Sequence, residues 1–556
     1  MTGKPPKLDH AIGAALCVAY VAVLLATAPA IGLSRDESIY VGSAHAYAGW
    51  LEQLVRDPGV ALTQAAIDKA WRVNSEHPPL VKTMFALSFL ADRELGLFSR
   101  ASLPFRFVGM LSAGALLWLI HVMGARLWNR RVGLFAALAY ALLPRPFYHA
   151  HLCAFDVPIT LAVTAVTYAY LRALAAQRWL SSSLIACGML YGAALATKHN
   201  SWVLPGIYAI HFVFVLLAAR VYRTKSGDTT STAARPTAAF PRWLLAMLVL
   251  GVPVFLASWP WLWHDTLKRL NGYAAFHLHH DYYNIEYFGV NYFWPPFPIS
   301  YPWVMTLYTV PLATLGLALA GMALRARALI GDVAAAIRGR APRDPLFSDV
   351  LFFGCAAAPL VIIALPSTPI FGGTKHWFTA YPFLMLFAGF AFDQAMRVCS
   401  ASIGERHRPA LPYALGALLL APGLVETIHS HPFGLSHYGM AAGFVPGAAD
   451  RGMNRQFWGF TTGSLVPFFN KHVPDGSRVY VCDTTIGAFR MLAEDGLISK
   501  RIRPTLDLAQ SDFALVHHEK HMAEVDFQIW SAYGTTKPAY VLSYDGVPIV
   551  SVYERK

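Results

Sequence analysis

Two adjacent carboxylates, Asp36 and Glu37, lie just beyond the first long apolar stretch of the chain. Glu76 and His77 follow in the same predicted loop, immediately before a Pro-Pro pair that restricts the backbone. A carboxylate beside an apolar wall can serve as a general base, because burial raises its pKa toward the neutral range. The alternative is that Asp36 and Glu37 are solvated loop residues.

The same four side chains could bind a phosphate group or a metal ion. Asp36 and Glu76 are the candidate ligands for a divalent metal, although their spacing matches no metal-binding motif. A later loop holds His277, His279 and His280, but their spacing without a fixed scaffold is a weak metal signal. The need for a divalent cofactor is therefore left open.

A third acid, Asp156, ends the segment Tyr148–Asp156 and leads directly into an apolar stretch. Ionisable residues at the edge of a membrane are costly, and they indicate a functional site by default. Asp156 can also cap a helix that begins ahead of Pro158. Both roles are compatible.

Cationic groups stand at the ends of two later apolar stretches: Lys198, and the pair Lys375 and His376. Such side chains can extend toward the headgroups and have no further role. If they face the acids across one membrane surface, they can instead bind a phosphate group.

The composition indicates a polytopic membrane protein. Of the 556 residues, 56% are hydrophobic and 14% are charged, against about a quarter charged in soluble domains. The net charge of +13 comes mainly from basic residues in short loops between apolar stretches. This is the positive-inside pattern of membrane proteins, so the charge gives no support for a nucleic-acid partner. The six cysteines show no paired spacing, and most are expected to be small buried residues.

We expect about eleven membrane-spanning helices, with the N-terminus cytoplasmic and the first span retained although it resembles a signal peptide. A shorter apolar patch at 78–91 is predicted to be an interfacial helix within an external loop, 32–102. The loop 261–301 is also expected outside, and 221–241 and 325–347 are predicted to be flexible cytoplasmic connectors. The predicted spans are 8–31, 103–127, 131–145, 156–176, 180–197, 201–220, 242–260, 302–324, 348–366, 377–397 and 410–428.

The chain is expected to divide into a transmembrane domain, 1–430, and a small external α/β domain, 431–556. The second part has the composition of a soluble domain and carries an Asp545-Gly546 hairpin turn. A helix is predicted at 486–499, and strands are predicted at 478–482, 513–516, 539–542 and 548–553.

The ordered set of these motifs resembles the C-type glycosyltransferase superfamily. Within it, the branch that holds the protein O-mannosyltransferases and the lipid A aminoarabinose transferase is most similar. The resemblance covers roughly residues 8–400. It rests on Asp36-Glu37, Glu76-His-Pro-Pro-Leu80, Leu103-Pro-Phe-Arg106, Asp156 and Lys375-His-Trp377.

This resemblance implies transfer of a hexose or pentose from a polyprenyl-phosphate donor to an external acceptor, which could be a protein, a lipid or a glycan. It implies a multi-pass protein of the inner (plasma) membrane, with the active site and the C-terminal domain on the periplasmic side. Asp36 would be the base or would orient the acceptor, with Glu37 as its neighbour and Asp156 as the second acid. The donor phosphate would be bound by Glu76, His77, Arg106, Lys198, Lys375 and His376.

The sequence departs from the family pattern at two positions. His77 stands where many relatives have Lys or Arg, so its charge is expected to depend on pH. Trp377-Phe378 replaces an Arg-Tyr pair, which could move a donor contact to Lys375.

Two other classes of function remain as alternatives. A transporter or flippase of lipid-linked sugars would be expected to show related halves and broken helices at mid-membrane, and the sequence shows no such repeat. A non-catalytic envelope assembly factor would not need the acids, so substitution of Asp36 distinguishes it from an enzyme.

Overall fold

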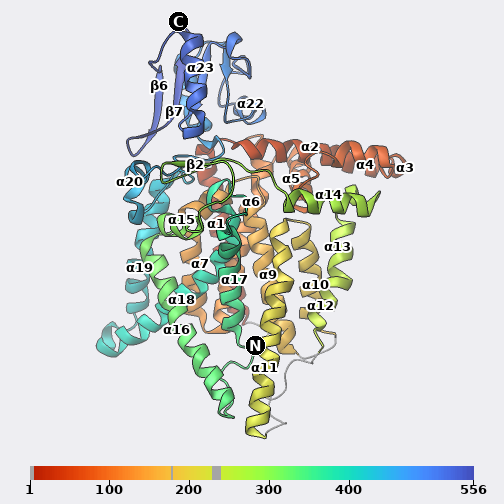
Figure 1. Ribbon diagram of the computed structural model, residues 1–556, viewed down its shortest axis with the longest axis vertical. Helices are drawn as coiled ribbons and strands as arrows, with labels where there is room; N and C mark the ends of the chain where they lie inside the picture. Colours follow the sequence, from red (N-terminus) through yellow and green to blue (C-terminus); the bar gives the residue numbers. More distant parts are fainter. Residues whose placement is uncertain (1–5, 177–179, 228–239) are drawn as a thin grey trace.

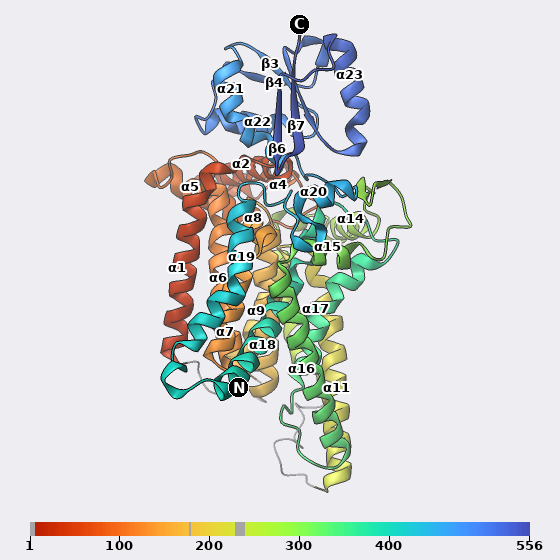
Figure 2. The same cartoon turned by 90° about the vertical axis from the view of Figure 1, so that its left-hand side faces the viewer.

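Long apolar helices run side by side in the computed structural model, which describes residues 6–176, 180–227 and 240–556. A small sheet domain formed by the C-terminal part of the chain lies at one end of this bundle (Figures 1 and 2). The predicted fold class, a polytopic helical protein with a small α/β domain, is therefore confirmed.

Among the described residues, seven helices are long and apolar enough to cross a membrane. Two of them begin with a short 3-10 helix and one ends in such a helix, and these are labelled η. The seven are α1 (Lys7–Thr27) with η1 (Ala28–Ala30), α6 (Leu103–Leu127), α9 (Asp156–Ala176), η2 (His199–Val203) with α11 (Leu204–Ser226), α16 (Leu312–Ile337), η5 (Gly373–Ala380) with α18 (Tyr381–Ser402), and α19 (Leu411–Ser430).

Shorter apolar helices complete the bundle, and together with the long ones they account for each predicted span. A π-helical turn, η3, interrupts the seventh of these spans. Their bounds are α7 (Arg130–Ala141), α8 (Pro144–Ala150), α10 (Ser182–Leu195), α12 (Arg242–Ala246), η3 (Met247–Gly251), α13 (Val252–Ala257) and α17 (Ser348–Ala364).

The predicted span 302–324 is wrong as a single helix. It is divided into α15 (Tyr301–Thr309) and α16, because Pro311 lacks a backbone donor and holds Val310 in an extended conformation. The predicted connector 325–347 is wrong over its first half, since α16 continues to Ile337 through alanine-rich sequence that favours a helix. The connector 221–241 is helical up to Ser226, and its residues 228–239 lie outside the described part of the chain.

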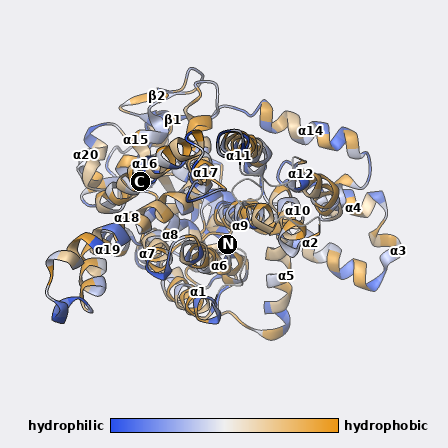
Figure 3. Cartoon of the chain, turned by 90° about the horizontal axis from the view of Figure 1, so that it is seen from below, coloured by the Kyte–Doolittle hydropathy of each residue, from blue (hydrophilic) through white to orange (hydrophobic). Residues whose placement is uncertain are grey.

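The basic segments lie at the end of the bundle away from the sheet domain, where α11 and α16 project (Figures 1 and 2). Seen from below, the bundle helices are largely hydrophobic, whereas the turn between α18 and α19 is hydrophilic (Figure 3). That turn contains η6 (Glu405–His407).

A layer of short helices lies across the end of the bundle that carries the sheet domain (Figure 1). The ring of Trp71 stacks on Tyr47 at 4.0 Å, which fastens α4 to α2. A helix, α5, is present where the interfacial helix 78–91 was expected, and its place at the membrane interface stays a prediction. The layer consists of α2 (Arg35–Arg56), α3 (Pro58–Ala61), α4 (Gln64–Trp71), α5 (Leu80–Leu95), η4 (Pro260–Leu262), α14 (Thr266–Leu278), β1 (Ile285–Tyr287) and β2 (Val290–Tyr292).

The C-terminal domain contains a five-stranded mixed sheet with the strand order β4-β3-β5-β7-β6. Both residues of the predicted hairpin turn, Asp545 and Gly546, have positive φ, as a type I′ turn requires. The sequence missed β4, a three-residue edge strand that contains a proline. The predicted helix 486–499 ends early, at Glu494. The strands are β3 (Arg478–Tyr480), β4 (Arg503–Thr505), β5 (Phe513–His517), β6 (Tyr540–Tyr544) and β7 (Val547–Glu554); the helices are α21 (Val466–His472), α22 (Ile486–Glu494), α23 (Ala523–Tyr533), η9 (Leu508–Gln510) and η10 (Lys520–Met522).

The segment between α19 and the sheet packs against the bundle. Its Tyr438 and Trp458 are buried in the same apolar cluster as the membrane helices, whereas the sheet has a cluster of its own. The division of the chain at residue 430 stays a prediction. The segment contains η7 (Met440–Ala442), α20 (Phe444–Asp450) and η8 (Phe460–Leu465).

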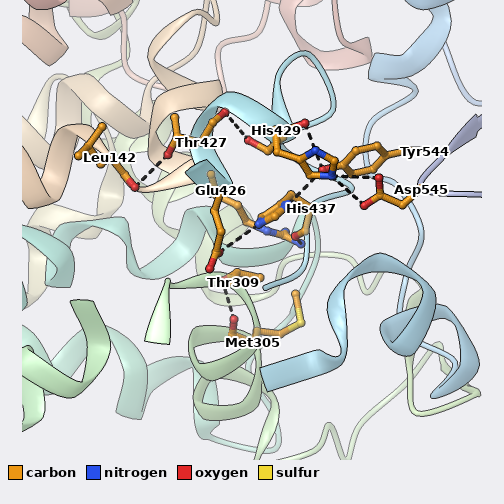
Figure 4. Close-up of polar contacts among 11 residues, drawn as sticks. Leu142, Met305, Thr309, Glu426, Thr427, His429, His437, Tyr544 and Asp545 are labelled. Carbon is orange, nitrogen blue, oxygen red and sulfur yellow. Dashed lines mark hydrogen bonds and ion pairs between the residues drawn. The ribbon is translucent and has the colours of Figure 1, made fainter. Parts of the chain in front are cut away.

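A polar network fixes the β6–β7 hairpin to the end of α19 (Figure 4). His429 Nε2 lies 2.9 Å from a carboxylate oxygen of Asp545. His437 connects the hydroxyl of Tyr544, at 3.1 Å, to the carboxylate of Glu426, at 3.3 Å. The sheet domain is thereby held in one place over the bundle.

Candidate functional site

The first turn of α2 carries Asp36 at the centre of the site. A capping box starts this helix, in which the backbone N–H of Ser34 donates to Glu37 Oε2 at 2.7 Å. The side chain of Asp36 is 26% exposed, and its Oδ2 lies 3.7 Å from Lys375 Nζ. Asp36 is therefore paired with a cation and still accessible.

Glu37 has a different environment from its neighbour. It is fully buried, and its two oxygens lie 2.9 and 3.0 Å from the guanidinium nitrogens of Arg106. Oε1 also accepts a hydrogen bond from the backbone N–H of Cys153. Arg106 in turn donates to the carbonyls of Ile31 and Gly32. This ion pair connects the loop before α2 to α6. Both carboxylate oxygens of Glu37 are already engaged in hydrogen bonds.

Asp156 begins α9 and lies between two basic groups. Its Oδ1 is 2.7 Å from Lys198 Nζ, and its Oδ2 is 3.3 Å from His149 Nδ1. All three side chains are buried. A buried carboxylate paired in this way remains charged and holds Lys198 in a fixed position.

A turn with two glycines at positive φ, Gly372 and Gly373, leads into η5 and positions Lys375. The ammonium group of Lys375 lies 3.9 Å from the ring centroid of Trp458, a cation–π contact. The ring of the next residue, His376, is held by the carbonyl of Phe371 at 2.6 Å.

These side chains surround an inner cavity with an empty volume of about 600 Å³. Two of the candidate residues do not face it: Glu76 lies farther out, and Arg106 lies behind Glu37. The lining includes Ser34, Asp36, Glu37, Tyr40, His77, Phe155, Asp156, Lys198, His199, His277, His280, Phe371, Lys375, His376 and Trp458.

Two larger spaces adjoin the inner cavity. The outer cavity, with an empty volume of about 1500 Å³, is lined by Glu76 and shares Asp36 with the inner one. An apolar groove of about 1230 Å³ runs along α17 and shares His199 and His376 with the inner cavity. The polar centre of the site is thus reached from an apolar side and from a polar side.

His77 is partly buried and lines both the inner and the outer cavity. Burial, together with the nearby charges of Lys82 and other basic groups, holds the pKa of His77 well below its usual value. The imidazole is therefore neutral around pH 7, which differs from the pH-dependent charge expected from the sequence.

The sequence analysis missed Lys82, which supports the loop that carries Glu76 and His77. It is fully buried in α5, and its Nζ donates to the carbonyls of Asn74, at 2.6 Å, and His77, at 2.9 Å. Asn74 then donates to Glu76 Oε1 at 2.5 Å. The available signal was a single lysine within an otherwise apolar patch.

The described residues contain no group of three or more His, Cys, Asp or Glu side chains that could hold a metal ion. Near Asp36 and Glu76, the cation of Lys375 and the amide of Asn74 already contact the carboxylates. The side chain of His277 lies against the carbonyl of Glu76. These groups therefore fit a divalent metal poorly.

The family model of dolichyl-phosphate-mannose-protein mannosyltransferases matches residues 76–234 of the chain. The matched range begins at Glu76 and includes Arg106, Asp156 and Lys198. The resemblance expected from the sequence is confirmed over this range. No curated protein matches the chain.

Several solved structures of membrane transferases are similar at low identity. ArnT from Cupriavidus metallidurans, bound to undecaprenyl phosphate, is 16% identical over 96% of this chain and 97% of that chain, with a TM-score of 0.45. The oligosaccharyltransferase from Archaeoglobus fulgidus in its apo form is 10% identical over 95% of this chain and 71% of that chain, with a TM-score of 0.48. With TM-scores of 0.45 and 0.48, these structures are too distant for their residues to be compared with the site.

Proposed function

We propose that this chain is a membrane glycosyltransferase that moves a sugar from a polyprenyl-phosphate donor to an acceptor hydroxyl. The observation that carries the proposal is the junction of the three spaces. An apolar groove, a cavity lined by lysines and an outer cavity lined by acids meet at His280 and Phe371, and Asp36 lines both the inner and the outer cavity. The family match over residues 76–234 supports the same class of reaction.

The donor would bind with its lipid in the apolar groove, against α17 residues such as Ile362 and Ile363. Its phosphate would then reach Lys198 and Lys375 in the inner cavity. An amphiphile with an anionic headgroup suits this combination, because the cations stabilise the charge that develops on the departing phosphate.

In the reaction, the acceptor oxygen forms a bond to the anomeric carbon of the donor sugar. The bond between that carbon and the phosphate oxygen breaks, and the phosphate leaves with the electron pair. Asp36 accepts the proton of the acceptor hydroxyl, since it is the accessible carboxylate shared by the inner and outer cavities. Asp156 positions Lys198, and Glu37 with Arg106 positions the start of α2.

Orientation follows from charge. The basic ends of α11 and α16 would face the cytoplasm, and the sheet domain with the site would lie on the periplasmic side of the plasma membrane. The acceptor would then arrive from the periplasmic side and the donor from within the bilayer.

Asp36→Asn tests the proposal. Loss of a general base lowers turnover by about 100- to 10,000-fold, so we expect transfer from radiolabelled polyprenyl-phosphate sugars to be nearly abolished in purified protein. Asp57→Asn is a matched control, because this exposed residue caps α3 and asparagine caps a helix equally well. Turnover of the Asp36 variant within a few-fold of the unchanged chain would exclude Asp36 as the base.

A further inference from the structure

The outer cavity is built partly by the sheet domain. Asp483 follows β3, and Glu519 follows β5; both line the cavity together with Asn74 and Glu76 of the bundle layer. The two strands are parallel neighbours, so their carboxyl ends meet at one edge of the sheet.

This edge is a topological switch point. The chain leaves β3 for β4 on one side and then returns across β3 to β5 on the other side. In open α/β sheets, ligands bind in the crevice that such a reversal opens beyond the carboxyl ends of the strands. Here that crevice faces the outer cavity.

We propose that the outer cavity is an acceptor site for an uncharged carbohydrate, whose hydroxyl groups bind to Asp483, Glu519 and Asn454 and whose ring packs on Tyr283. This inference rests on the proposed function and specifies its acceptor class. It also assigns the sheet domain a role in binding.

Charge excludes an anionic acceptor. Four carboxyl groups line the outer cavity: Asp36, Glu76 and Asp483, together with Glu519, whose pKa is raised by burial. Its lining cation, Arg35, is already engaged, since it lies 3.0 Å from Asp483 and 3.6 Å from Asp36. A phosphorylated acceptor would meet repulsion here, in contrast to the lysines of the inner cavity.

The outer cavity offers both acceptors and donors of hydrogen bonds, which suits a ligand with several hydroxyl groups. Asn454 is 5% exposed, and within the described residues its Oδ1 has no hydrogen-bond partner. Gln456 holds Asp483 and Glu519 side by side by donating to both. Burial and the adjacent Asp483 raise the pKa of Glu519 well above its usual value, so its carboxyl can also donate a hydrogen bond.

Aromatic side chains complete the lining. Tyr283 is 51% exposed and borders the opening, and Phe276, Phe371 and Trp458 lie farther in. A few polar groups among aromatic rings are the usual composition of a small-molecule site. A peptide acceptor would present one hydroxyl to this lining, whereas a carbohydrate presents several.

Binding of the acceptor can be measured without turnover. The full-length protein in nanodiscs is titrated with neutral trisaccharides, with their phosphorylated counterparts and with a Ser/Thr-rich peptide, by calorimetry and by the fluorescence of tryptophan. We expect saturable binding of a neutral trisaccharide, weakened at least about tenfold by Asp483→Asn and by Tyr283→Ala. Tyr283 is half-exposed, so its variant keeps the fold even if Asp483→Asn does not.

Asp475→Asn is the control, because this acid lies on the exposed side of the same domain beside Arg501. Stronger binding of the phosphorylated sugars or of the peptide would overturn the inference, as would the absence of any trisaccharide binding. Binding that survives both variants would overturn it too. Failure of the proposed function is recognised separately, as an absence of donor turnover in the unchanged chain.

Discussion

At the scale of single residues, adjacent acids have taken separate roles. Asp36 and Glu37 are neighbours on one helix, where consecutive side chains point about 100° apart. Asp36 lines both cavities and is partly exposed, whereas Glu37 lines only the inner cavity and is paired with the buried guanidinium of Arg106. The two carboxylates therefore have different chemistry although the sequence presents them as a pair.

The neutral state of His77 makes a prediction about pH. Its pKa is lower in the folded protein than in the unfolded chain, so the unfolded chain binds more protons as the pH falls below the ordinary histidine range. The contribution of neutral His77 to the free energy of unfolding is therefore present above the ordinary histidine pKa and is lost as the pH falls below it. In His77→Gln, we expect a smaller drop in melting temperature between about pH 7.5 and about pH 5 than in the unchanged chain.

Other buried histidines also lower the melting temperature on acidification. The effect of His77 is therefore the difference between His77→Gln and the unchanged chain. His407→Gln, at an exposed position in the turn before α19, serves as the control. An identical dependence of melting temperature on pH in His77→Gln and in the unchanged chain would contradict a neutral His77.

At the scale of elements, the start of α2 is fixed by the C-terminal part of the chain. The backbone N–H of Arg35 donates to the carbonyl of Trp458 at 2.8 Å, and the hydroxyls of Ser38 and Thr485 lie 2.7 Å apart. The loop before α2 also touches η8, where Gly32 and Gly463 meet backbone to backbone. The position of Asp36 thus depends on residues more than 400 positions away in the sequence.

Gly463→Ala tests this dependence. A Cβ at Gly463 would lie 2.4 Å from the Cα of Gly32, so the backbone must shift, at a cost of about 1–3 kcal/mol. We expect a lower melting temperature together with reduced sugar transfer.

Gly42→Ala is the matched control on α2, because a Cβ there has no neighbour within 4 Å and alanine favours a helix. It should leave the melting temperature unchanged or higher. Equal effects of the two substitutions would show that the close approach at Gly32 does not position α2.

At the scale of the whole molecule, the basic end of the bundle is separate from the end that carries the candidate site. The sheet domain and α2, whose first turn carries Asp36, lie at one end, and α11 and α16 project at the other (Figures 1 and 2). Basic residues are retained on the cytoplasmic side during insertion, so this separation supports the proposed orientation.

Labelling of introduced cysteines measures this orientation. We expect a membrane-impermeant maleimide added to spheroplasts to label Glu524→Cys in the sheet domain and to spare Arg340→Cys beyond α16. Both positions are exposed, and the signal of the six native cysteines is subtracted from the unchanged chain. Labelling of Arg340→Cys alone would place the site in the cytoplasm instead.

The sequence alone determined the helical class, the position of nearly every bundle helix and the groups available for chemistry. Apolar length and loop charge are local properties, and the bilayer imposes them on each segment separately. These local properties gave a wrong prediction at two places. Pro311 divides one apolar stretch into two helices, and an alanine-rich segment predicted to be a connector is helical up to Ile337.

Only the tertiary structure decided which groups share a cavity. Asp36, Asp156 and Lys375 come from three distant segments, and the packing of α2, α9 and η5 brings them together. It also separated Asp36 from Glu37, made His77 neutral, revealed Lys82 as the support of its loop and placed Asp483 of the sheet domain at the outer cavity. The physical reason is that burial and pairing of charges depend on contacts between segments, which periodicity and composition do not encode.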